Sequence, residues 1–408
     1  MKKGLRKLAA ALLVVCMLTA CKEKTTPAPS EVTETPAPTE EATPEVTATP
    51  TPEESKHGAE WDNITLKERY EDCFKIGVAL PATMFRNDRY MELVKQQFNS
   101  FTFENEMKPD ALLNRDATQK GYPDTNTEPV LNFGGIKKGL DFAKANGFGV
   151  RGHTLCWYSQ TPKWFFTEDY KENSPLCSRE VMIARLESYI RQVMTYCQEE
   201  YPGLIYAWDV VNEAVDIGTG DESGIRKEKN NWYAVIGPDF ISYAFAFARK
   251  YSDGTADLYY NDYGCAGKKQ DIVRILAPIK EAGNIDGIGM QCHLSAGDNM
   301  RNAVYRTAKF FADAGYKVQI TELDIGTSQK GERADLIQAM KYKALFQFME
   351  EAKKSGEVSI DSVTVWGLYD TASWRRGENP LLFRIDGTLK KKEAWYGAMQ
   401  VPDIAAME

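Results

Sequence analysis

Histidine is scarce in this sequence, and the motifs of several common enzyme classes are absent. The chain has three histidines, and the two outside the N-terminal region, His153 and His293, are far apart, so the His-Glu-x-x-His pair of zinc hydrolases is missing. A Gly-x-Ser-x-Gly turn for acyl transfer is also missing. No Gly-x-Gly-x-x-Gly turn follows the first predicted strand, which disfavours a dinucleotide-binding fold.

Positive charge and long apolar runs are also in short supply. The formal net charge is −8, and no basic stripe is present that could release counterions from a phosphate backbone, so nucleic acid is not an expected partner. Beyond the first 20 residues we find no apolar run of the roughly 20 residues that cross a bilayer. The sequence therefore predicts no transmembrane helix in the remainder of the chain.

The eight cysteines do not have the paired spacing of a zinc site. Several fall within apolar patterns, where a free thiol behaves as a small hydrophobic group. We expect mostly free thiols and no metal or other cofactor, although one or two disulfides remain compatible with the sequence. The six cysteines after the N-terminal region are Cys73, Cys156, Cys177, Cys197, Cys265 and Cys292.

The first residues have the pattern of an export signal. A basic patch from Lys2 to Lys7 precedes an apolar run at 8–18 that is too short to span a bilayer, and Leu-Thr-Ala-Cys follows at 18–21. This end resembles the signal of bacterial lipoproteins, which predicts a signal peptide at 1–20 and lipid attachment at Cys21. The protein would then lie at the extracellular face of the cell envelope. The alternative is an ordinary signal peptide cleaved after Ala20.

Residues 21–57 are predicted to be a disordered linker that follows the lipidated cysteine. Positions 22–57 contain seven prolines, nine threonines and no Phe, Tyr or Trp, so the segment cannot bury enough apolar surface to offset its ordering entropy. Prolines favour extended conformations, which predicts a semi-stiff tether. Residues 58–408 have no second break of this kind and are predicted to form one domain.

Short apolar runs alternate with longer helical segments through this domain. Strands buried on both faces are predicted at 75–80, 100–103, 149–155, 206–211, 257–260, 287–290, 317–321 and 362–366. Residues 181–200 have a helical stripe that ends at Pro202 and Gly203, and a further helix is predicted around 336–348. Eight strands that alternate with helices predict an α/β fold of the (β/α)8 TIM barrel type, with a doubly wound open sheet as the alternative.

Polar and aromatic residues cluster just after the predicted strands, which in a barrel is the catalytic face. Any one of them has an ordinary structural interpretation, such as a helix cap or a core tryptophan. Their recurrence at seven strand ends favours a functional site. Its carboxylates and amides are groups that hydrogen-bond sugar hydroxyls, and its indoles are groups that stack on sugar rings. The residues include Glu104, Asn105, Lys108, His153, Trp157, Gln160, Asn212, Glu213, Asn261, Asp262, Gln291, His293, Glu322, Asp324, Trp366 and Trp374.

Several of these segments resemble the strand motifs of glycoside hydrolase family 10. They are Phe-Glu-Asn-Glu-Met-Lys at 103–108, Gly-His-Thr-Leu at 152–155, Trp-Asp-Val-Val-Asn-Glu at 208–213, Gly-Met-Gln-Cys-His at 289–293 and Ile-Thr-Glu-Leu-Asp at 320–324, with Ser-Trp-Arg at 373–375 and Pro-Leu-Leu-Phe at 380–383. The resemblance covers essentially the whole domain in order. It implies a retaining endo-1,4-β-xylanase that acts on xylan and xylo-oligosaccharides, on a TIM barrel and without a metal.

The resemblance also implies a role for each matching residue. Glu213 is expected to be the acid/base and Glu322 the nucleophile. Asn212, His293 and Asp324 are expected to support them, Asn212 by holding a sugar hydroxyl and Asp324 by orienting His293. The expected substrate-binding residues are Glu104, Asn105, Lys108, His153, Trp157, Gln291, Trp366 and Trp374. Retention needs the two carboxyl groups about 5–5.5 Å apart, and residues from different strands of one barrel mouth can supply that spacing.

One departure and two alternatives accompany this resemblance. The family often has Trp-His-Ser-Gln where this chain has Trp157-Tyr158-Ser159-Gln160, which bears on the surroundings of the acid/base and on the pH optimum. The first alternative is a retaining β-1,4-glucanase on the same type of barrel. The second is a surface lipoprotein that binds glycans without turnover. A monomer whose partners are its glycan and, through Cys21, the membrane is expected.

Overall fold

The computed structural model describes residues 56–405. All of the described residues belong to one compact unit. The predicted signal peptide, Cys21 and almost all of the predicted linker lie outside the described residues, so these assignments stay predictions. Within the described range, no helix has the length and apolar character needed to cross a membrane.

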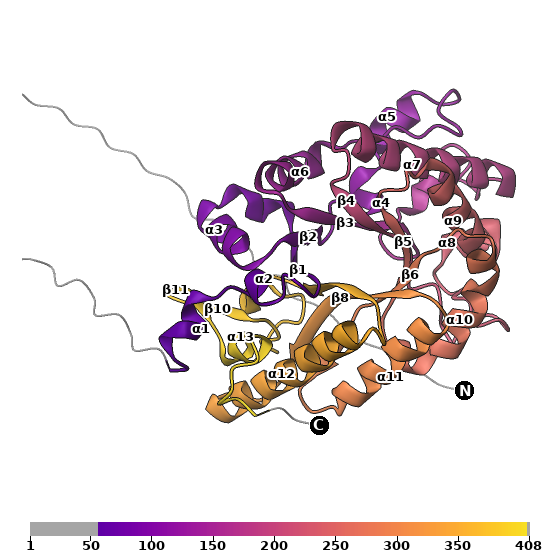
Figure 1. Cartoon of the computed structure of the whole chain (residues 1–408). Coiled ribbons are helices and arrows are strands. Elements are labelled where there is room, and N and C mark those ends of the chain that lie inside the picture. The colour runs from indigo at the N-terminus through magenta and orange to yellow at the C-terminus, as the bar shows by residue number, and fades with distance from the viewer. Residues whose placement is uncertain (1–55, 406–408) are drawn as a thin grey trace, which may run out of the picture. The chain divides into compact units, whose positions relative to one another are not determined.

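Eight parallel strands close into a barrel, which confirms the predicted fold (Figure 1). Neighbours pair in the order β6-β5-β4-β3-β2-β1-β9-β8, and β6 pairs with β8 to close the ring. The barrel strands are β1 (Lys75–Leu80), β2 (Ser100–Phe103), β3 (Gly149–Trp157), β4 (Ile205–Asn212), β5 (Asp257–Asp262), β6 (Gly287–Met290), β8 (Lys317–Gly326) and β9 (Ile360–Val365). The short β7 (His293–Ser295) follows β6 and pairs with the end of β8. A separate hairpin consists of β10 (Phe383–Asp386) and β11 (Thr388–Lys391).

The strands are buried along almost their whole length because helices cover the outside of the ring and side chains fill its inside. In β1 and β8 every residue after the first is buried. Four strands run past their predicted ends, β3 to Trp157, β4 to Asn212, β5 to Asp262 and β8 to Gly326. In β4, β5 and β8 the sequence pattern ended the strand early because polar residues begin there, but those polar residues are buried and continue the strands.

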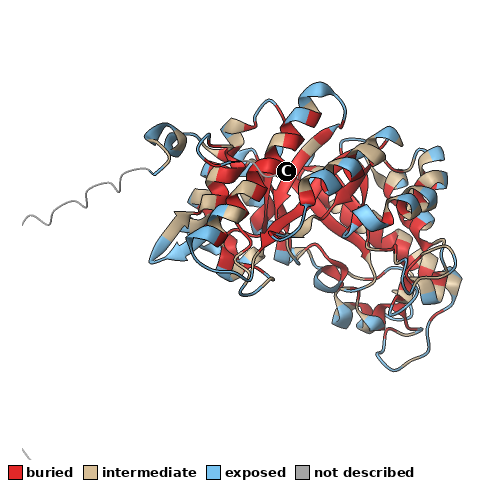
Figure 2. Ribbon diagram, turned by 90° about the horizontal axis from the view of Figure 1, so that it is seen from below, coloured by how far each residue is buried: buried red, intermediate tan, exposed pale blue. Residues whose placement is uncertain are grey.

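Helices surround the barrel, with exposed faces outward and buried faces toward the strands (Figure 2). They include α1 (Ala59–Asn63), α2 (Leu66–Arg69), α3 (Asp88–Gln97), α4 (Pro109–Leu112), α5 (Arg115–Lys120), α6 (Gly134–Asn146), α7 (Arg179–Glu200), α8 (Asn231–Ile236), α9 (Phe240–Tyr251), α10 (Cys265–Glu281), α11 (Met300–Asp313), α12 (Glu332–Ser355) and α13 (Glu393–Ala398), with 3-10 turns η1 (Ala82–Arg86), η2 (Lys163–Phe166) and η3 (Asp370–Ala372). Both helices expected from the sequence, α7 and α12, are present. Gly356 ends α12 in the left-handed region, at φ 77°.

The start of the described chain packs against its end. The His57 ring is 4% exposed and makes hydrogen bonds of 2.9 Å with Glu393 and 2.8 Å with Asp403. Arg69 makes a bidentate pair with Glu350 of α12, at 3.1 and 2.8 Å. The folded unit thus includes His57, one residue before the predicted domain boundary at Gly58.

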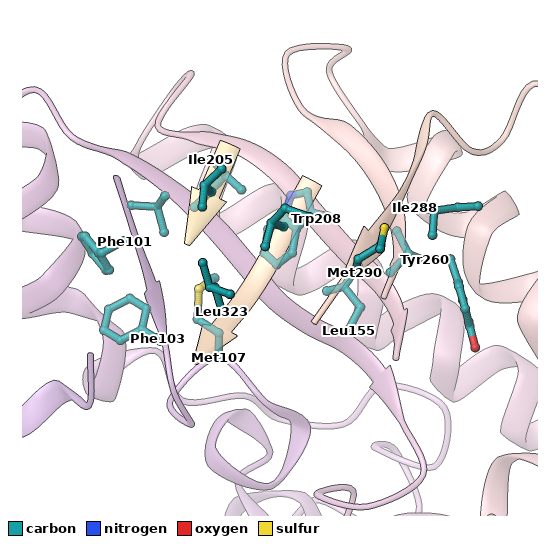
Figure 3. Packing of buried hydrophobic residues seen from close by; sticks show 14 of the residues in the cluster. Phe101, Phe103, Met107, Leu155, Ile205, Trp208, Tyr260, Ile288, Met290 and Leu323 are labelled. Atoms are coloured by element: carbon teal, nitrogen blue, oxygen red, sulfur yellow. The ribbon is translucent and has the colours of Figure 1, made fainter. Parts of the chain in front are cut away.

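Large side chains fill the barrel, and close strand contacts require small partners (Figure 3). Trp208 of β4 is 1% exposed and lies beside Gly152, its register partner on β3. A Cβ atom at Gly152 would lie 2.1 Å from the indole ring, so only glycine fits there. The six cysteines of the described range are free thiols, and all but Cys292 are buried.

Candidate active site

A cavity of about 640 Å³ lies at the carboxyl ends of the barrel strands. Its walls come from residues that follow β2, β3, β4, β5, β6, β8 and β9, so segments far apart in the sequence meet at one mouth. The lining residues are Glu104, Asn105, Lys108, His153, Trp157, Gln160, Asn212, Glu213, Tyr263, Gly264, Gln291, His293, Glu322, Trp366 and Trp374.

Glu322 is a buried carboxylate within β8, 5% exposed. Its Oε1 accepts a hydrogen bond of 2.8 Å from the Asn261 amide, and its Oε2 accepts one of 3.2 Å from His293 Nε2. Burial alone would raise the pKa of Glu322, but the hydrogen bonds and the imidazolium outweigh it and lower the pKa below its ordinary value. The side chain is therefore ionised at neutral pH.

His293 owes its charge to two carboxylates. Its Nδ1 donates to Asp324 at 2.8 Å while its Nε2 donates to Glu322. Burial lowers the pKa of His293, but the two hydrogen bonds and the negative charges raise it to about 10. Asp324 is fully buried and also accepts from Trp374 Nε1 at 3.0 Å and from Arg375 at 2.7 Å. This set of donors fixes the orientation of the imidazolium beside Glu322.

Glu213 follows β4 directly and receives three donors. Its Oε1 accepts from Gln291 at 2.9 Å and from Asn212 at 3.2 Å, and its Oε2 accepts from Trp157 Nε1 at 3.2 Å. Its backbone has a φ of 56°, in the left-handed region that residues other than glycine seldom adopt. Its main-chain oxygen accepts from Arg226 Nε at 3.0 Å.

Two amide side chains connect the two carboxylates. Asn261 Nδ2 donates to Glu322 and also, at 2.9 Å, to Asn212 Oδ1, while Asn212 donates in turn to Glu213. The hydroxyl of Thr321 donates to Asn261 Oδ1 at 2.6 Å, which fixes the orientation of that amide. Glu213 and Glu322 thus face one cavity through a continuous hydrogen-bond network.

The part of the cavity after β2 and β3 carries a different set of groups. Lys108 Nζ donates to Gln160 at 2.8 Å and to Asn105 at 3.2 Å, and it lies 4.8 Å from the centre of the Trp157 ring. Burial raises the pKa of Glu104 to about 7, and the negative charge of Glu106 adds to the effect. Burial also lowers the pKa of Lys108. These polar groups are partly desolvated and suited to hydroxyl-rich ligands.

A buried charge network supports His153 from inside the barrel. His153 Nδ1 is 2.9 Å from Asp209, and Arg151 makes a bidentate pair with the same carboxylate at 3.1 and 2.6 Å. Arg151 and Asp209 are both fully buried. Since breaking a buried pair leaves an uncompensated charge, this network holds the His153 ring firmly at the cavity floor.

Tyr158 is the position that departs from the family pattern, and it lies against Arg226. The guanidinium is 4.3 Å from the centre of the Tyr158 ring, and it also donates to Tyr263 Oη at 3.0 Å. Burial raises the pKa of Tyr158, and the charge of Glu213 raises it further. Tyr158 and Tyr263 thus both contact Arg226, close to Glu213.

The structure brings together every site residue that the sequence predicted within the domain. All of them line the cavity except Asn261 and Asp262 of β5 and Asp324, which lies behind His293. Asn261 was noted only as a residue after the fifth strand, although it connects the two carboxylates. Arg151, Asp209, Arg226, Tyr263 and Gly264 were not singled out. Charged residues inside an apolar strand pattern were the available signal for Arg151 and Asp209.

No group of three or more His, Cys, Asp or Glu side chains in the described range is placed to hold a metal ion.

Comparison with known proteins gives consistent matches. Residues 65–401 match the family described as Glycosyl hydrolase family 10. The chain is 43% identical over 346 residues to endo-1,4-beta-xylanase B of Butyrivibrio fibrisolvens, which covers 83% of this chain and 53% of that protein. It is 41% identical over 352 residues to endo-1,4-beta-xylanase A of Thermotoga maritima, covering 83% of this chain and 31% of that protein. The chain therefore spans about half or less of the length of these curated relatives.

Solved structures agree with the sequence matches. The CBM22-1–GH10 modules of the Clostridium thermocellum xylanase 10B, complexed with xylohexaose, superpose with a TM-score of 0.76 at 36% identity, covering 83% of this chain and 68% of that one. The intracellular xylanase TsXylA of Thermoanaerobacterium saccharolyticum superposes with a TM-score of 0.72 at 32% identity, covering 83% of this chain and 98% of that one.

Proposed function

Since the chain belongs to glycosyl hydrolase family 10, we propose that it is an endo-1,4-β-xylanase that cleaves internal xylosidic bonds of xylan with retention of configuration. The observation that carries the proposal is the pairing of Glu213 with Glu322 across one cavity through Asn212 and Asn261. One carboxylate is held ionised by an imidazolium and the other is surrounded by neutral donors. Such a difference between two carboxyl groups is what a retaining glycosidase needs.

In the first step Glu322 attacks the anomeric carbon of the bound sugar. The lowered pKa of Glu322 keeps the attacking oxygen unprotonated. The protonated Glu213 donates its proton to the glycosidic oxygen as that bond breaks, so the leaving sugar departs with a neutral hydroxyl. The products of this step are a glycosyl ester on Glu322 and an ionised Glu213.

In the second step Glu213 acts as the base. It takes a proton from a water molecule, whose oxygen attacks the same anomeric carbon and displaces Glu322. Two displacements at one carbon restore the starting configuration. Gln291 and Trp157 hydrogen-bond Glu213 and hold its carboxyl group in place for both proton transfers.

The remaining lining residues are proposed to bind the polymer. Glu104, Asn105, Lys108 and His153 would bind the sugars on the glycone side of the cleavage point. Trp157, Trp366 and Trp374 would form apolar walls for sugar rings. Trp374 is 61% exposed, so its indole is free to contact a substrate at the cavity rim.

A reducing-sugar assay on xylan with wild type, Glu322→Ala and the matched surface variant Glu281→Ala tests the proposal. Wild type and Glu281→Ala should release product at equal rates, and Glu322→Ala should lose nearly all activity while it melts like wild type. NMR of the first products should show the β-anomer. Equal turnover by Glu322→Ala, or an α-anomer first, would reject the mechanism. Running soluble β-glucan in parallel separates a xylanase from a glucanase.

We also propose that Cys21 carries a lipid that anchors the protein at the outer face of the cell envelope, and that the protein is a monomer. The support for the anchor is the basic patch, the short apolar run and the Leu-Thr-Ala-Cys end at 18–21. Cys21→Ala should move activity from the membrane fraction of the producing cells to the medium. Light scattering of a soluble form that starts at residue 22 should give the mass of one chain.

A further inference from the structure

Arg226 is a buried arginine beside the active site that the proposed mechanism does not use. It lies in the loop between β4 and α8, is 9% exposed and does not line the main cavity. A guanidinium keeps its charge at every working pH, so burying it is costly unless acceptors surround it. The acceptors around Arg226 therefore indicate what its side chain does.

Each nitrogen of the Arg226 guanidinium has an acceptor of its own. Its Nε donates to the main-chain oxygen of Glu213, one terminal nitrogen donates to Tyr263 Oη and the other pairs with Asp216, each at 3.0 Å. The planar fork of an arginine fixes the directions of such bonds relative to one another. The Glu213 carbonyl is therefore held by a rigid group that is itself held at two further points.

The ring of Tyr158 covers the same guanidinium. The centre of the ring lies 4.3 Å from the central carbon of Arg226, within the range of a cation–π contact. Tyr158 follows β3, whereas Arg226 lies on the loop after β4, so the contact joins two loops. Since Tyr158 is the residue that departs from the family pattern, this contact is a feature of the present chain.

The main chain of Arg226 is anchored as well as its side chain. Its N–H donates to the oxygen of Ala214 at 2.7 Å, and its own oxygen accepts from the Asn230 amide at 2.8 Å. The first of these bonds closes the loop on itself directly after Glu213. The Arg226 side chain thus extends from a fixed point toward the Glu213 carbonyl.

The carbonyl held by Arg226 belongs to the residue that transfers the proton. Glu213 has a left-handed backbone, with φ 56°, and such a residue relaxes toward commoner conformations unless its surroundings hold it. Because Cβ is bonded to the same Cα atom, any such relaxation moves the carboxyl group. A displacement of about 1 Å at a reacting group can lower a rate about 100-fold.

From these contacts we propose that Arg226 is a positioning residue for the two proton transfers of Glu213, and that Tyr158 and Asp216 keep its guanidinium in the orientation that this requires. The role rests on the proposed function. Arg226 contacts neither the bound sugar nor the transferred proton, so it acts only through Glu213. Its removal should impair the steps in which a proton is given or taken and leave sugar binding intact.

Two aryl β-xylobiosides separate proton transfer from the other steps. Dinitrophenolate leaves without a proton, whereas phenolate leaves readily only when Glu213 protonates it, and kcat/KM reports on this first displacement. In Arg226→Gln, kcat/KM on the phenyl glycoside should fall about 10- to 100-fold, while the value on the dinitrophenyl glycoside stays within about twofold of wild type. An equal fall on both glycosides, or no fall on either, would overturn the proposal.

Variants of Tyr158 and a lysine at position 226 give the second arm of the test. Tyr158→Ala should show the same selective loss, and it replaces Arg226→Gln if that variant does not fold. Tyr158→Phe keeps the ring and should recover most of the loss. Arg226→Lys keeps the charge but not the fork, so it should behave like Arg226→Gln. Wild-type values in Arg226→Lys, or in Tyr158→Ala, would overturn the proposal.

Arg179 provides the matched control. It lies 5.7 Å from the centre of the Tyr243 ring, pairs with Asp239 and donates to the main-chain oxygen of Ile236, all away from the cavity lining. Arg179→Gln therefore removes the same three kinds of contact and should leave both kcat/KM values unchanged. A selective loss in this variant would refute the specific role of Arg226. Wild type that cleaves neither xylobioside would instead overturn the proposed function.

Discussion

Replacing Asp324 by asparagine tests how the cavity keeps Glu322 ionised. The substitution preserves size and removes one negative charge. Asp324 accepts from His293 and Trp374 on one oxygen and from Arg375 on the other. Asparagine has one acceptor oxygen and one amide donor, so whichever way it turns, a donor faces a donor. The variant should lower the pKa of His293 and weaken the local packing.

The magnitude follows from His293. Although burial lowers the pKa of His293, its hydrogen bonds to Asp324 and Glu322 raise it from 6.5 to about 10, which corresponds to a preference on the order of 5 kcal/mol for the imidazolium. If the two carboxylates share it equally, losing the charge of Asp324 removes about 2 kcal/mol. The pKa of His293 should then fall to between about 8 and 9, so His293 stays an imidazolium at pH 5 but loses its proton near pH 9, where wild type largely keeps it. A neutral imidazole no longer stabilises the ionised Glu322, so kcat/KM of the variant relative to wild type should fall most at high pH, by about 10- to 100-fold.

The assay is a pH profile of kcat/KM, which reports on the free enzyme. In Asp324→Asn the alkaline limb should fall more steeply than in wild type, while urea unfolding shows a loss of about 1–3 kcal/mol from the unpaired donor. Asp313→Asn makes the same exchange in an exposed ion pair with Lys309 and should change neither property noticeably. If the alkaline limbs of Asp324→Asn and wild type coincide, Asp324 does not control the charge beside Glu322.

Three further predictions concern the frame and the specificity of the cavity. Although burial raises the pKa of Glu350, Arg69 and other donors lower it to about 2. The ionised Glu350 therefore stabilises the folded protein above the unfolded-state pKa, and this stabilisation is lost as the pH falls toward 2. Glu350→Gln should lower the free energy of unfolding at pH 7 by about 2 kcal/mol and flatten the pH dependence of that free energy between pH 5 and 2. Gly152→Ala puts a methyl group 2.1 Å from the Trp208 ring and should cost about 3 kcal/mol, and a melting temperature equal to that of wild type would contradict this packing. Trp374→Ala should raise the ratio of kcat/KM on soluble β-glucan to that on xylan, because the exposed indole would crowd a hydroxymethyl group on the sugar, and an unchanged ratio would show that this residue does not select xylose.

The strand pattern was readable from the sequence because a closed parallel barrel buries both faces of each strand. Apart from Lys75, the runs at 75–80 and 287–290 contain only apolar or small residues, and their bounds agree with β1 and β6. The pattern failed at the carboxyl ends of β3, β4, β5 and β8. In β4, β5 and β8, buried polar residues such as Asn212 extend the strand because the cavity, rather than the apolar core, supplies their partners.

The chemistry-bearing residues of the candidate site were readable because each one lies toward or just after the carboxyl end of a strand, and topology brings these ends to one mouth. The residues that hold these side chains in place could not be predicted from the sequence. Arg226 lies on the loop after β4, and its contacts with Tyr158 and Tyr263 join three separate loops. Asn261 gains its place only when its neighbours in the barrel are known, because its partners lie 49 and 61 positions away.

Glu213 illustrates a constraint that no residue pattern reveals. Its left-handed backbone, at φ 56°, costs on the order of 1 kcal/mol for a side chain of this kind. Such a conformation persists only where the surroundings impose it. Here the Glu213 N–H donates to Asn261 O at 2.9 Å, its main-chain oxygen accepts from Arg226, and its carboxylate accepts from Asn212, Gln291 and Trp157. Backbone and side chain are thus fixed independently, which keeps the carboxyl group at one point facing Glu322 while it gives up and regains a proton.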